Sequence, residues 1–295
     1  MTLKLRGVAV SAATVGVVAL GALVAPSAIA APSAKWAAVG DAAIRPGVVT
    51  DTEGGGRCTS NFIFTAGSKT FIGQAAHCAG TGDATETDGC DSGSMPLGTP
   101  VAIKGLDGKD RKGKLAYSSW VTMQKKGEKD ADTCAYNDFA LVEIADGDAA
   151  DVNPTVPVFG GPDGVNTTGL STGSTVYSYQ NSPLRLGISA LSPKVGLVAQ
   201  EAGGGRSHVV YTVTPGIPGD SGSGFMDGSG KAVGVLSTLN IAPVAASNGV
   251  ADLGKALAYA NANGGVGKIA IANGTEPFSP NPVGVAGDLL KLPQL

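Results

Sequence analysis

A glycine-rich turn near residue 220 presents a serine in a setting suited to nucleophilic catalysis. The segment Pro215-Gly216-Ile217-Pro218-Gly219-Asp220-Ser221-Gly222-Ser223-Gly224 lies between two β-rich runs. Because glycine adopts backbone conformations that other residues avoid, such a turn can expose one hydroxyl while backbone N–H groups converge beside it. Taken alone, the segment is equally compatible with an ordinary turn between strands. A serine hydroxyl is a weak nucleophile, so catalysis also requires a histidine base and a carboxylate that orients it.

The chain contains two histidines, and their settings differ. His77 ends a predicted hairpin and precedes Cys78, where a disulfide would fix its backbone, whereas His208 opens a predicted strand after three glycines. We therefore favour His77 as the base. Asp138 enters the strongly apolar run 139–142, where an unpaired acid would be costly to bury. A buried acid needs a partner, and histidine is the natural one.

These segments resemble the motifs of the chymotrypsin-like (trypsin-fold) serine proteases, in particular the secreted bacterial members. Ala75-Ala76-His77-Cys78 is similar to the histidine motif of that family, Asp138-Phe139-Ala140-Leu141-Val142 to its aspartate motif and Gly219-Asp220-Ser221-Gly222-Ser223 to its serine motif. The order histidine, aspartate, serine differs from the order in α/β-hydrolases and subtilisins. The resemblance covers roughly residues 45 to 265.

The resemblance implies a mechanism. Ser221 would attack the scissile carbonyl, His77 would take the proton and return it to the leaving amine, and Asp138 would orient the imidazole. The backbone N–H groups of Gly219 and Ser221 would form the oxyanion hole. No cofactor and no metal are expected.

Two further positions bear on substrate binding. By the same resemblance, Ser237 would lie on the strand that pairs with the substrate backbone. Pro215 occupies the place where trypsins carry an acid at the pocket floor, so cleavage after arginine or lysine is not expected, and a small or apolar side chain is favoured. The family's cysteine just before the serine motif is replaced by Ile217 or Pro218, so we expect this wall of the pocket to be held differently.

In animal relatives, the aspartate that matches Asp220 pairs with a freshly cut amino terminus. The resemblance therefore implies that Asp220 needs a cation as a partner. No such activation site is present near the start of the chain, where the closest segment is Ile44-Arg45-Pro46-Gly47. We therefore expect an internal arginine, Arg185 or Arg206, to pair with Asp220.

The chain has four cysteines, an even number that is typical of disulfides in an oxidising compartment. The resemblance pairs Cys58 with Cys78, and Cys90 with Cys134 then follows only by elimination. With no CxxC pair and two histidines, a zinc site is not expected. The acidic loop Asp83–Asp91 lacks the spacing of a calcium-binding EF-hand, so a solvated loop is favoured.

The first thirty residues have the pattern of a signal peptide. A short basic start with Lys4 and Arg6 precedes a nearly uncharged run over 8–25, and Ala28-Ile29-Ala30 offers small residues at a cleavage site. A transmembrane anchor is the alternative. The Ala-rich end of the run favours cleavage after Ala30, and therefore a secreted, extracellular protein that is free of the membrane once cut.

The remaining sequence predicts an all-β fold with two antiparallel six-stranded β-barrels and a short C-terminal helix. Short β-rich runs alternate with turns of glycine, proline, asparagine and aspartate, and they are not separated by helical patterns. The helix is predicted over 252–262, with Asp252 as its N-cap. Strands are predicted at 62–64, 70–73, 101–103, 114–123, 139–144, 175–179, 208–214 and 232–239. The charged stretches 107–114 and 125–132 are expected as exposed hairpin loops.

We place the N-terminal barrel at 46–155 and the C-terminal barrel, with its helix, at 156–275. Residues 31–45 form a pro-segment or an N-terminal arm, and 276–295 form a proline-rich tail. The formal charge is −3 with only 15% charged residues, so nucleic acid is not an expected partner.

Together these features predict a secreted, monomeric serine endopeptidase that acts on polypeptides. Two alternatives are a protease-fold binding protein that has lost catalysis and a secreted esterase.

Overall fold

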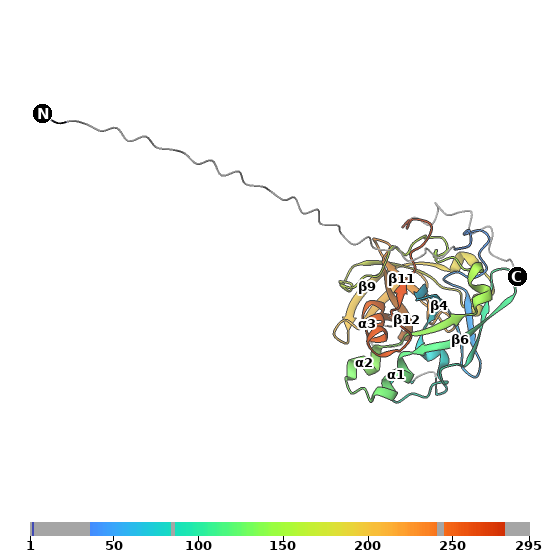
Figure 1. Cartoon of the computed structure of the whole chain (residues 1–295), viewed down its shortest axis with the longest axis horizontal. Helices are drawn as coiled ribbons and strands as arrows, with labels where there is room; N and C mark the ends of the chain where they lie inside the picture. Colours follow the sequence, from blue (N-terminus) through green and yellow to red (C-terminus); the bar gives the residue numbers. More distant parts are fainter. Residues whose placement is uncertain (1, 3–35, 84–85, 241–244, 281–295) are drawn as a thin grey trace. The chain divides into compact units, whose positions relative to one another are not determined.

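A computed structural model describes residues 2, 36–83, 86–240 and 245–280 of the chain. Apart from residue 2, the predicted signal peptide therefore lies outside the described residues, as do the start of the 31–45 segment and most of the proline-rich tail. From residue 36 onward the described chain belongs to one compact unit, which is built almost entirely from antiparallel strands (Figure 1).

The first part of this unit is an eight-stranded antiparallel sheet. The spatial order of the strands in this sheet is β14 (Ala270–Ile271), β3 (Ile63–Ala66), β4 (Lys69–Gln74), β7 (Ala140–Ile144), β6 (Asp110–Ser118), β5 (Pro100–Lys104), β1 (Val49–Thr52) and β2 (Arg57–Thr59). The predicted hairpin is present as β3 and β4, with Gly67 in the turn at a φ of 60°.

The second part is a closed six-stranded barrel, as the sequence predicts. The order around the barrel is β10 (Ser207–Thr212), β13 (Ser247–Asp252), β12 (Ala232–Asn240), β11 (Gly224–Asp227), β8 (Thr175–Tyr179) and β9 (Pro193–Ala202). Every neighbouring pair in the barrel is antiparallel, and β10 pairs with β9 to complete the closure.

The predicted all-β, two-unit fold is thus confirmed, with one difference in strand count. The first sheet has eight strands rather than six, and one of the two additional strands is β14, which comes from the far end of the chain and pairs with β3. Ala272 N–H donates to the Ile63 carbonyl at 2.9 Å, and both side chains are buried in the core of the first sheet. The chain therefore returns to its first sheet after completing the barrel.

The predicted C-terminal helix is confirmed as α3 (Leu253–Asn263). Asp252 is its N-cap, because Asp252 Oδ1 accepts a hydrogen bond from the Lys255 N–H at 2.8 Å. Its buried face, which includes Leu253, Ala256, Leu257 and Ala260, packs on the barrel, where α3 lies against β12 (Figure 1).

The sequence-based assignment of 114–123 as a strand is wrong in its second half. Strand β6 ends at Ser118, which caps the helix α1 (Ser119–Lys126), and Gly127 ends that helix with a left-handed φ of 65°. The charged stretch 125–132 is likewise not a hairpin loop, because Asp130 caps α2 (Ala131–Tyr136). Four short 3₁₀ helices complete the described elements: η1 (Ala76–Ala79), η2 (Asp146–Asp151), η3 (Pro183–Arg185) and η4 (Ser189–Leu191).

One cluster of buried side chains joins the sheet, the barrel and α3. Phe139, which directly follows Asp138, packs edge-on against Phe64 with ring centroids 5.5 Å apart. Burying such a side chain contributes about 2 kcal/mol, so this contact anchors the aspartate motif. Other members of the cluster are Phe62, Tyr117, Leu141, Tyr177, Tyr179, Met226, Val235, Leu253 and Leu257.

The described parts of both predicted end segments pack on the folded unit. Ile44 is fully buried, and its N–H donates to the Asp151 carbonyl at 3.0 Å. At the other end, the Phe278 ring contacts Tyr177 with centroids 5.3 Å apart. Residues 36–45 and 276–280 are therefore integral to the fold.

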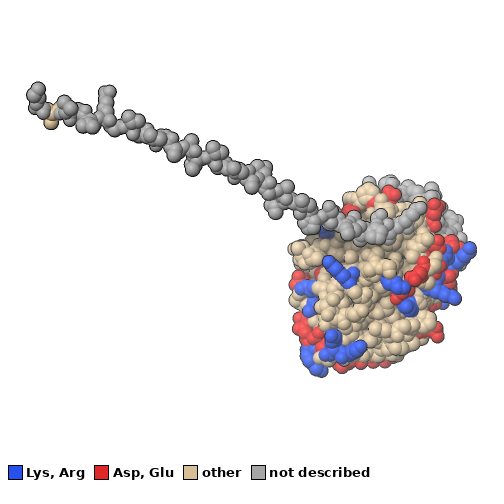
Figure 2. Space-filling view, viewed as in Figure 1, with Lys and Arg blue, Asp and Glu red and all other residues tan. Residues whose placement is uncertain are grey.

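Charges of both signs are interspersed on the surface. Figure 2 shows lysine and arginine beside acidic groups, with broad uncharged areas between them. Arg111, for example, pairs with Asp107 at 3.0 Å and with Asp151 at 2.9 Å. Among the described residues, no helix combines the length and apolarity needed to cross a bilayer.

Candidate active site

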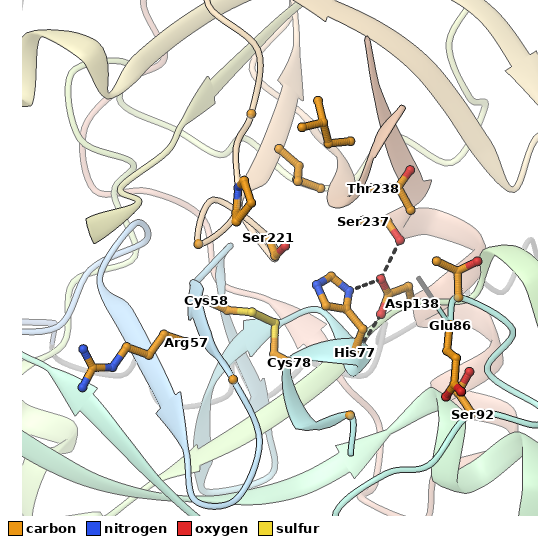
Figure 3. Close-up of a pocket in the computed structure, with 18 of the residues that line it drawn as sticks. Arg57, Cys58, His77, Cys78, Glu86, Ser92, Asp138, Ser221, Ser237 and Thr238 are labelled. Atoms are coloured by element: carbon orange, nitrogen blue, oxygen red, sulfur yellow. Dashed lines mark hydrogen bonds and ion pairs between the residues drawn. A yellow bond between two sulfur atoms is a disulfide. The ribbon is translucent and has the colours of Figure 1, made fainter. Parts of the chain in front are cut away.

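A cavity of about 660 Å³ opens between the first sheet and the barrel. It brings together most of the site residues that the sequence predicts (Figure 3). Contrary to the prediction, Pro215 does not line it, although its neighbour Gly216 does. The Pro215 carbonyl instead accepts a hydrogen bond from Arg185 Nη2 at 3.3 Å. The predicted residues that do line it are His77, Asp138, Gly219, Ser221 and Ser237.

His77 lies in η1, directly after strand β4. The adjacent disulfide, Cys58–Cys78, ties this short helix to β2. The His77 N–H donates to Asp138 Oδ1 at 2.9 Å, and its ring Nδ1 lies 2.7 Å from Asp138 Oδ2. The histidine is therefore held through both backbone and ring, while its side chain keeps 27% of its surface exposed to the cavity.

Asp138 lies between α2 and β7 and is buried. Ser119 fixes this segment, since its Oγ donates to the Asn137 carbonyl at 2.6 Å and accepts from the Phe139 N–H at 3.1 Å. Ser237 Oγ donates to Asp138 Oδ2 at 2.5 Å. Ser237 falls where the pairing of β12 with β13 shifts register, and such a bulge re-aims a side chain. The barrel thus contributes a donor to a carboxylate of the first sheet.

The pair of His77 and Asp138 perturbs the protonation of both groups. Burial lowers the pKa of His77, but the charge and hydrogen bond of Asp138 outweigh burial and leave the His77 pKa above its usual value of 6.5. Burial raises the pKa of Asp138, but the His77 charge and the hydrogen bonds from His77 and Ser237 bring it below its usual value. Asp138 is therefore an anion that stabilises a protonated imidazole.

Ser221 lies on a tight turn that packs closely against the first sheet. Gly219 and Gly222 have φ angles of 92° and 87°, in the left-handed region that favours glycine. A Cβ at Gly222 would lie only 2.6 Å from the Thr59 carbonyl oxygen. The turn therefore requires glycine at position 222, both for its backbone conformation and for the close approach of β2.

The carbonyl groups and the N–H groups of this turn differ in their hydrogen bonding. The carbonyls of Gly219 and Ser221 accept from Thr59, through Oγ1 at 2.8 Å and N–H at 2.9 Å respectively, and Asn61 Nδ2 donates to the Gly222 carbonyl at 3.0 Å. Among the described residues, the N–H groups of Gly219 and Ser221 have no acceptor. Two main-chain donors beside the serine are thus left available to a ligand.

The Ser221 hydroxyl and the Asp138 carboxylate lie on opposite sides of the His77 ring (Figure 3). No hydrogen bond joins the Ser221 hydroxyl to any described residue. It is free to turn toward His77 Nε2, and catalytic hydrogen bonds of this kind often tighten only when substrate binds.

The expected cation for Asp220 is Arg185. Its Nη2 bonds to Asp220 Oδ2, both side chains are buried, and Ser182 N–H donates to Oδ1 at 2.8 Å. The other candidate, Arg206, instead faces Asp130 at 3.7 Å. Burial, and then the charge of Arg185, lower the pKa of nearby Lys194 to about 8, with Asp220 opposing them.

The second histidine has no role in this cavity. His208 is fully buried in β10, and its Nε2 lies 3.2 Å from Asp252 Oδ2, on the residue that caps α3. Its Nδ1 has no partner among the described residues. His208 therefore belongs to the core that supports the helix.

The cysteines offer no thiolate to a metal. Cys90 pairs with Cys134, the second expected disulfide, which links the acidic loop to α2. The two groups of potential metal ligands in the described chain, one around His77 and one around Asp88, each contain disulfide-bonded cysteines. Neither group fits a metal site.

Sequence reasoning missed three residues that hold this site in place: Thr59, Asn61 and Ser119. Thr59 and Asn61 contact carbonyls about 160 positions away along the chain. Such contacts leave no local pattern. The one available signal is the position of Thr59, directly after Cys58.

Comparison with known proteins finds similarity only among solved structures, since no protein-family model and no curated protein matches the sequence. A glutamic acid specific serine protease, described as using a histidine triad in substrate binding, is 18% identical; the match covers 78% of this chain and 100% of that chain, with a TM-score of 0.46. Thermobifida fusca Protease A is 17% identical; the match covers 79% of this chain and 100% of that chain, with a TM-score of 0.46. A Glu endopeptidase in complex with MPD is 17% identical; the match covers 77% of this chain and 95% of that chain, with a TM-score of 0.49. Likeness at this level assigns neither an activity nor a residue role, so both rest on the geometry of the site.

Proposed function

We propose that this protein is a secreted serine endopeptidase in which Ser221 is the nucleophile and His77 is the general base. Asp138 orients the imidazole of His77 and stabilises its protonated form. The observation that carries the proposal is the His77 ring, which is held by the Asp138 carboxylate through Nδ1 and turns its other side toward Ser221. Generating a reactive hydroxyl requires this order of serine, imidazole and carboxylate.

The reaction would proceed by acyl transfer. Ser221 Oγ attacks the peptide carbonyl while His77 Nε2 accepts the hydroxyl proton, and the resulting oxyanion binds the N–H groups of Gly219 and Ser221. Collapse of this intermediate breaks the C–N bond, and His77 returns its proton to the leaving amine. Water, deprotonated by the same imidazole, then hydrolyses the acyl-enzyme. Each oxyanion donor contributes about 10²–10³ in rate.

Polypeptides fit the site as substrates, and the protein would act outside the cell as a monomer. The cavity has the two β12 neighbours Ser237 and Thr238 along one side, where an extended chain could pair with backbone groups. Two disulfides join distant segments, as is common in exported proteins. The predicted signal peptide, with cleavage after Ala30, would supply the export route.

A fluorophosphonate probe tests the proposal directly. The purified mature protein should be labelled at Ser221 and should hydrolyse a mixed peptide library. The variant Ser221→Ala should lose both properties and keep its melting temperature. Ser223→Ala is the matched control, because Ser223 Oγ is buried and bonded to the Asp220 carbonyl at 2.6 Å.

Other results would identify the alternatives. Folded protein without labelling would favour a binding protein on a protease fold. Labelling with rapid turnover of esters but none of peptides would favour an esterase. Peptide cleavage that persists in pure Ser221→Ala would refute the proposed mechanism.

A further inference from the structure

A second buried cation lies beside the ion pair of Arg185 and Asp220. Lys194 is the second residue of β9, and it is only 1% exposed. Its Nζ donates to Thr214 Oγ1, and in the described part of the chain no carboxylate forms an ion pair with it. Lysine is seldom fully buried unless it is paired, and burying a charge without a partner is costly.

Two charged groups act on the Lys194 ammonium. Arg185, on η3, repels it, and Asp220, on the serine turn, attracts it. The other polar side chains that face it within the described chain carry hydroxyls: Thr214, which follows β10, and the buried Ser178, which lies opposite Lys194 on β8. Because Asp220 is already bonded to Arg185, two cations share one carboxylate. The cluster therefore holds one positive charge in excess while Lys194 is protonated.

This cluster is directly connected to the two oxyanion donors. Asp220 lies between Gly219 and Ser221 in the sequence, and its buried carboxylate belongs to the cluster. Thr214 begins the same segment with a φ of 55°, a left-handed conformation that is uncommon for a β-branched residue. The hydroxyl contact with Lys194 lies at this point of the chain. The excess charge is thus next to the segment whose far end carries the donor N–H groups.

Other contacts already fix the backbone of this segment. The buried Asn248 accepts from the Gly216 N–H through Oδ1 at 2.8 Å, and its Nδ2 lies 3.2 Å from the Gly216 carbonyl. The Pro215 carbonyl accepts from Arg185 Nη2. A neutral side chain of similar length could fill the place of Lys194 in the barrel, so its charge is the property that needs a function.

Formation of the oxyanion would balance the excess charge. In the resting protein, burial and then the charge of Arg185 lower the pKa of Lys194 to about 8, against the opposing effect of Asp220. Attack of Ser221 on a peptide carbonyl would place a negative charge at the donor N–H groups. A cation buried nearby gains a partner only at that stage, so its interaction energy lowers the barrier rather than strengthening substrate binding.

We propose that Lys194 is a positioning residue for the oxyanion, because its buried ammonium supplies the segment before Ser221 with a positive charge that only the oxyanion balances. The inference rests on the proposed function, since it assigns a role in the same acyl transfer. Lys194 does not line the cavity, so it acts through the field at the donor N–H groups. One charge acting over about 10 Å at an effective dielectric constant of about 20 changes a rate by about tenfold.

The first test is the pH dependence of wild-type protein, measured as kcat/KM for a peptide that it cleaves. Activity should fall by about tenfold as pH rises through about 8, because Lys194 then loses its proton. Stability should respond in the opposite sense. Since the folded-state pKa of Lys194 lies below its usual 10.5, the unfolded chain binds more protons between these two values, and the contribution of Lys194 to stability rises with pH over that range.

Two substitutions separate the charge from the side chain. Lys194→Met keeps the length and loses the charge, so kcat/KM near neutral pH should fall by about tenfold. The further fall at alkaline pH should disappear in this variant, and its free energy of unfolding near neutral pH should be no lower than that of wild type. Lys194→Arg keeps the charge at every pH of the profile, so it should keep the wild-type rate and lose the alkaline fall.

Lys255→Met is the matched control. Lys255 Nζ also donates to a neutral oxygen, the Gly204 carbonyl at 3.0 Å, but this lysine is exposed on α3 and lies outside the cluster. The variant should keep both the rate of wild type and its alkaline fall. It thereby separates the loss of this particular charge from the loss of any lysine.

Each outcome decides between two conclusions. A wild-type profile without an alkaline fall would overturn the role of Lys194 while Ser221 still reacts with fluorophosphonate. A fall that coincides with unfolding, or that persists in folded Lys194→Met, would overturn it as well. An alkaline fall of wild-type activity without loss of stability supports the role even if neither variant folds. Protein that neither reacts with the probe nor cleaves any peptide would overturn the proposed function, and the role of Lys194 with it.

Discussion

The chain holds two histidine–aspartate pairs, and they differ in what surrounds the second ring nitrogen. In the pair of His77 and Asp138, Nδ1 contacts the carboxylate and the other side of the ring faces an open cavity and Ser221. In the pair of His208 and Asp252, Nε2 contacts the carboxylate and Nδ1 is buried without a partner among the described residues.

This comparison shows that pairing with a carboxylate does not by itself make a histidine a catalyst. Both pairs bury an aspartate, and both bring together segments that are distant in sequence. Only His77 combines the pairing with exposure and with a hydroxyl on its free side. We therefore expect the first pair to control activity and the second to control stability.

The largest expected effect is that of His77→Ala. Without its base, the Ser221 hydroxyl stays a poor nucleophile, and kcat for peptide hydrolysis should fall by about 10⁶-fold. The melting temperature should change little, because the ring is partly exposed. Steady-state kinetics and thermal unfolding on one preparation would measure both, and a fall of less than about tenfold would remove His77 from the mechanism.

The next effect is that of Asp138→Asn, for which kcat should fall by about 10⁴-fold. The amide keeps the shape of the side chain, but it favours the wrong tautomer of His77 and removes the charge that stabilises the imidazolium. Asp252→Asn, the same change in the other pair, should leave kcat within about threefold of wild type, as expected for a site outside the cavity. Equal losses of kcat in the two variants would contradict the comparison.

His208→Ala should reverse the pattern. Removing a fully buried ring leaves a cavity and an Asp252 oxygen without its partner, so the free energy of unfolding should fall by about 3 kcal/mol. Labelling of the folded fraction by fluorophosphonate should persist. Denaturant unfolding measures the first quantity, and loss of labelling without loss of stability would show that the roles of the two histidines are misassigned.

The smallest effect is on pH dependence. His77 must be neutral to accept a proton, and its pKa lies above the usual 6.5, so kcat/KM should rise with pH through a midpoint above 6.5. The contribution of His77 to stability has the opposite sign. A raised folded-state pKa stabilises the protein fully below the unfolded-state pKa and loses that contribution as pH rises through the folded-state pKa.

A pH profile of kcat/KM, with unfolding measured at the same pH values, would test this opposition. His208→Ala should keep the midpoint of wild type. A midpoint below 6.5 would mean that Asp138 does not act on His77 as the structure indicates.

A helix or strand could be predicted from the sequence where one short segment contains all the residues that specify it. The β3–β4 hairpin has its glycine turn, and α3 has Asp252 as a cap followed by a regular apolar face. The strand assigned to 114–123 failed because Ser118 and Gly127 act as helix caps within a run that also suits a strand. Without tertiary contacts, capping and β propensity compete on nearly equal terms.

Contacts across the chain were not predictable in the same way. Asn248 shows nothing in its local sequence that links it to Gly216, and Ser119 shows nothing that links it to the ends of the aspartate motif. Polar side chains that bind distant carbonyls leave no periodic pattern. The eighth strand, β14, is similarly hidden, since two residues are too short to carry an alternation.

The sequence by itself determined the class of fold, the two disulfide pairings that the resemblance and elimination supplied, and a short set of candidate groups: a serine on a glycine turn, two histidines and an aspartate before an apolar strand. It could do so because turn residues, cysteines and apolar runs act locally. Only the tertiary structure decided which histidine faces the serine, which arginine neutralises Asp220 and which side chain accepts from the Gly216 N–H. Those outcomes depend on the direction of single atoms within a packed interior, and packing fixes direction only when the whole chain has folded.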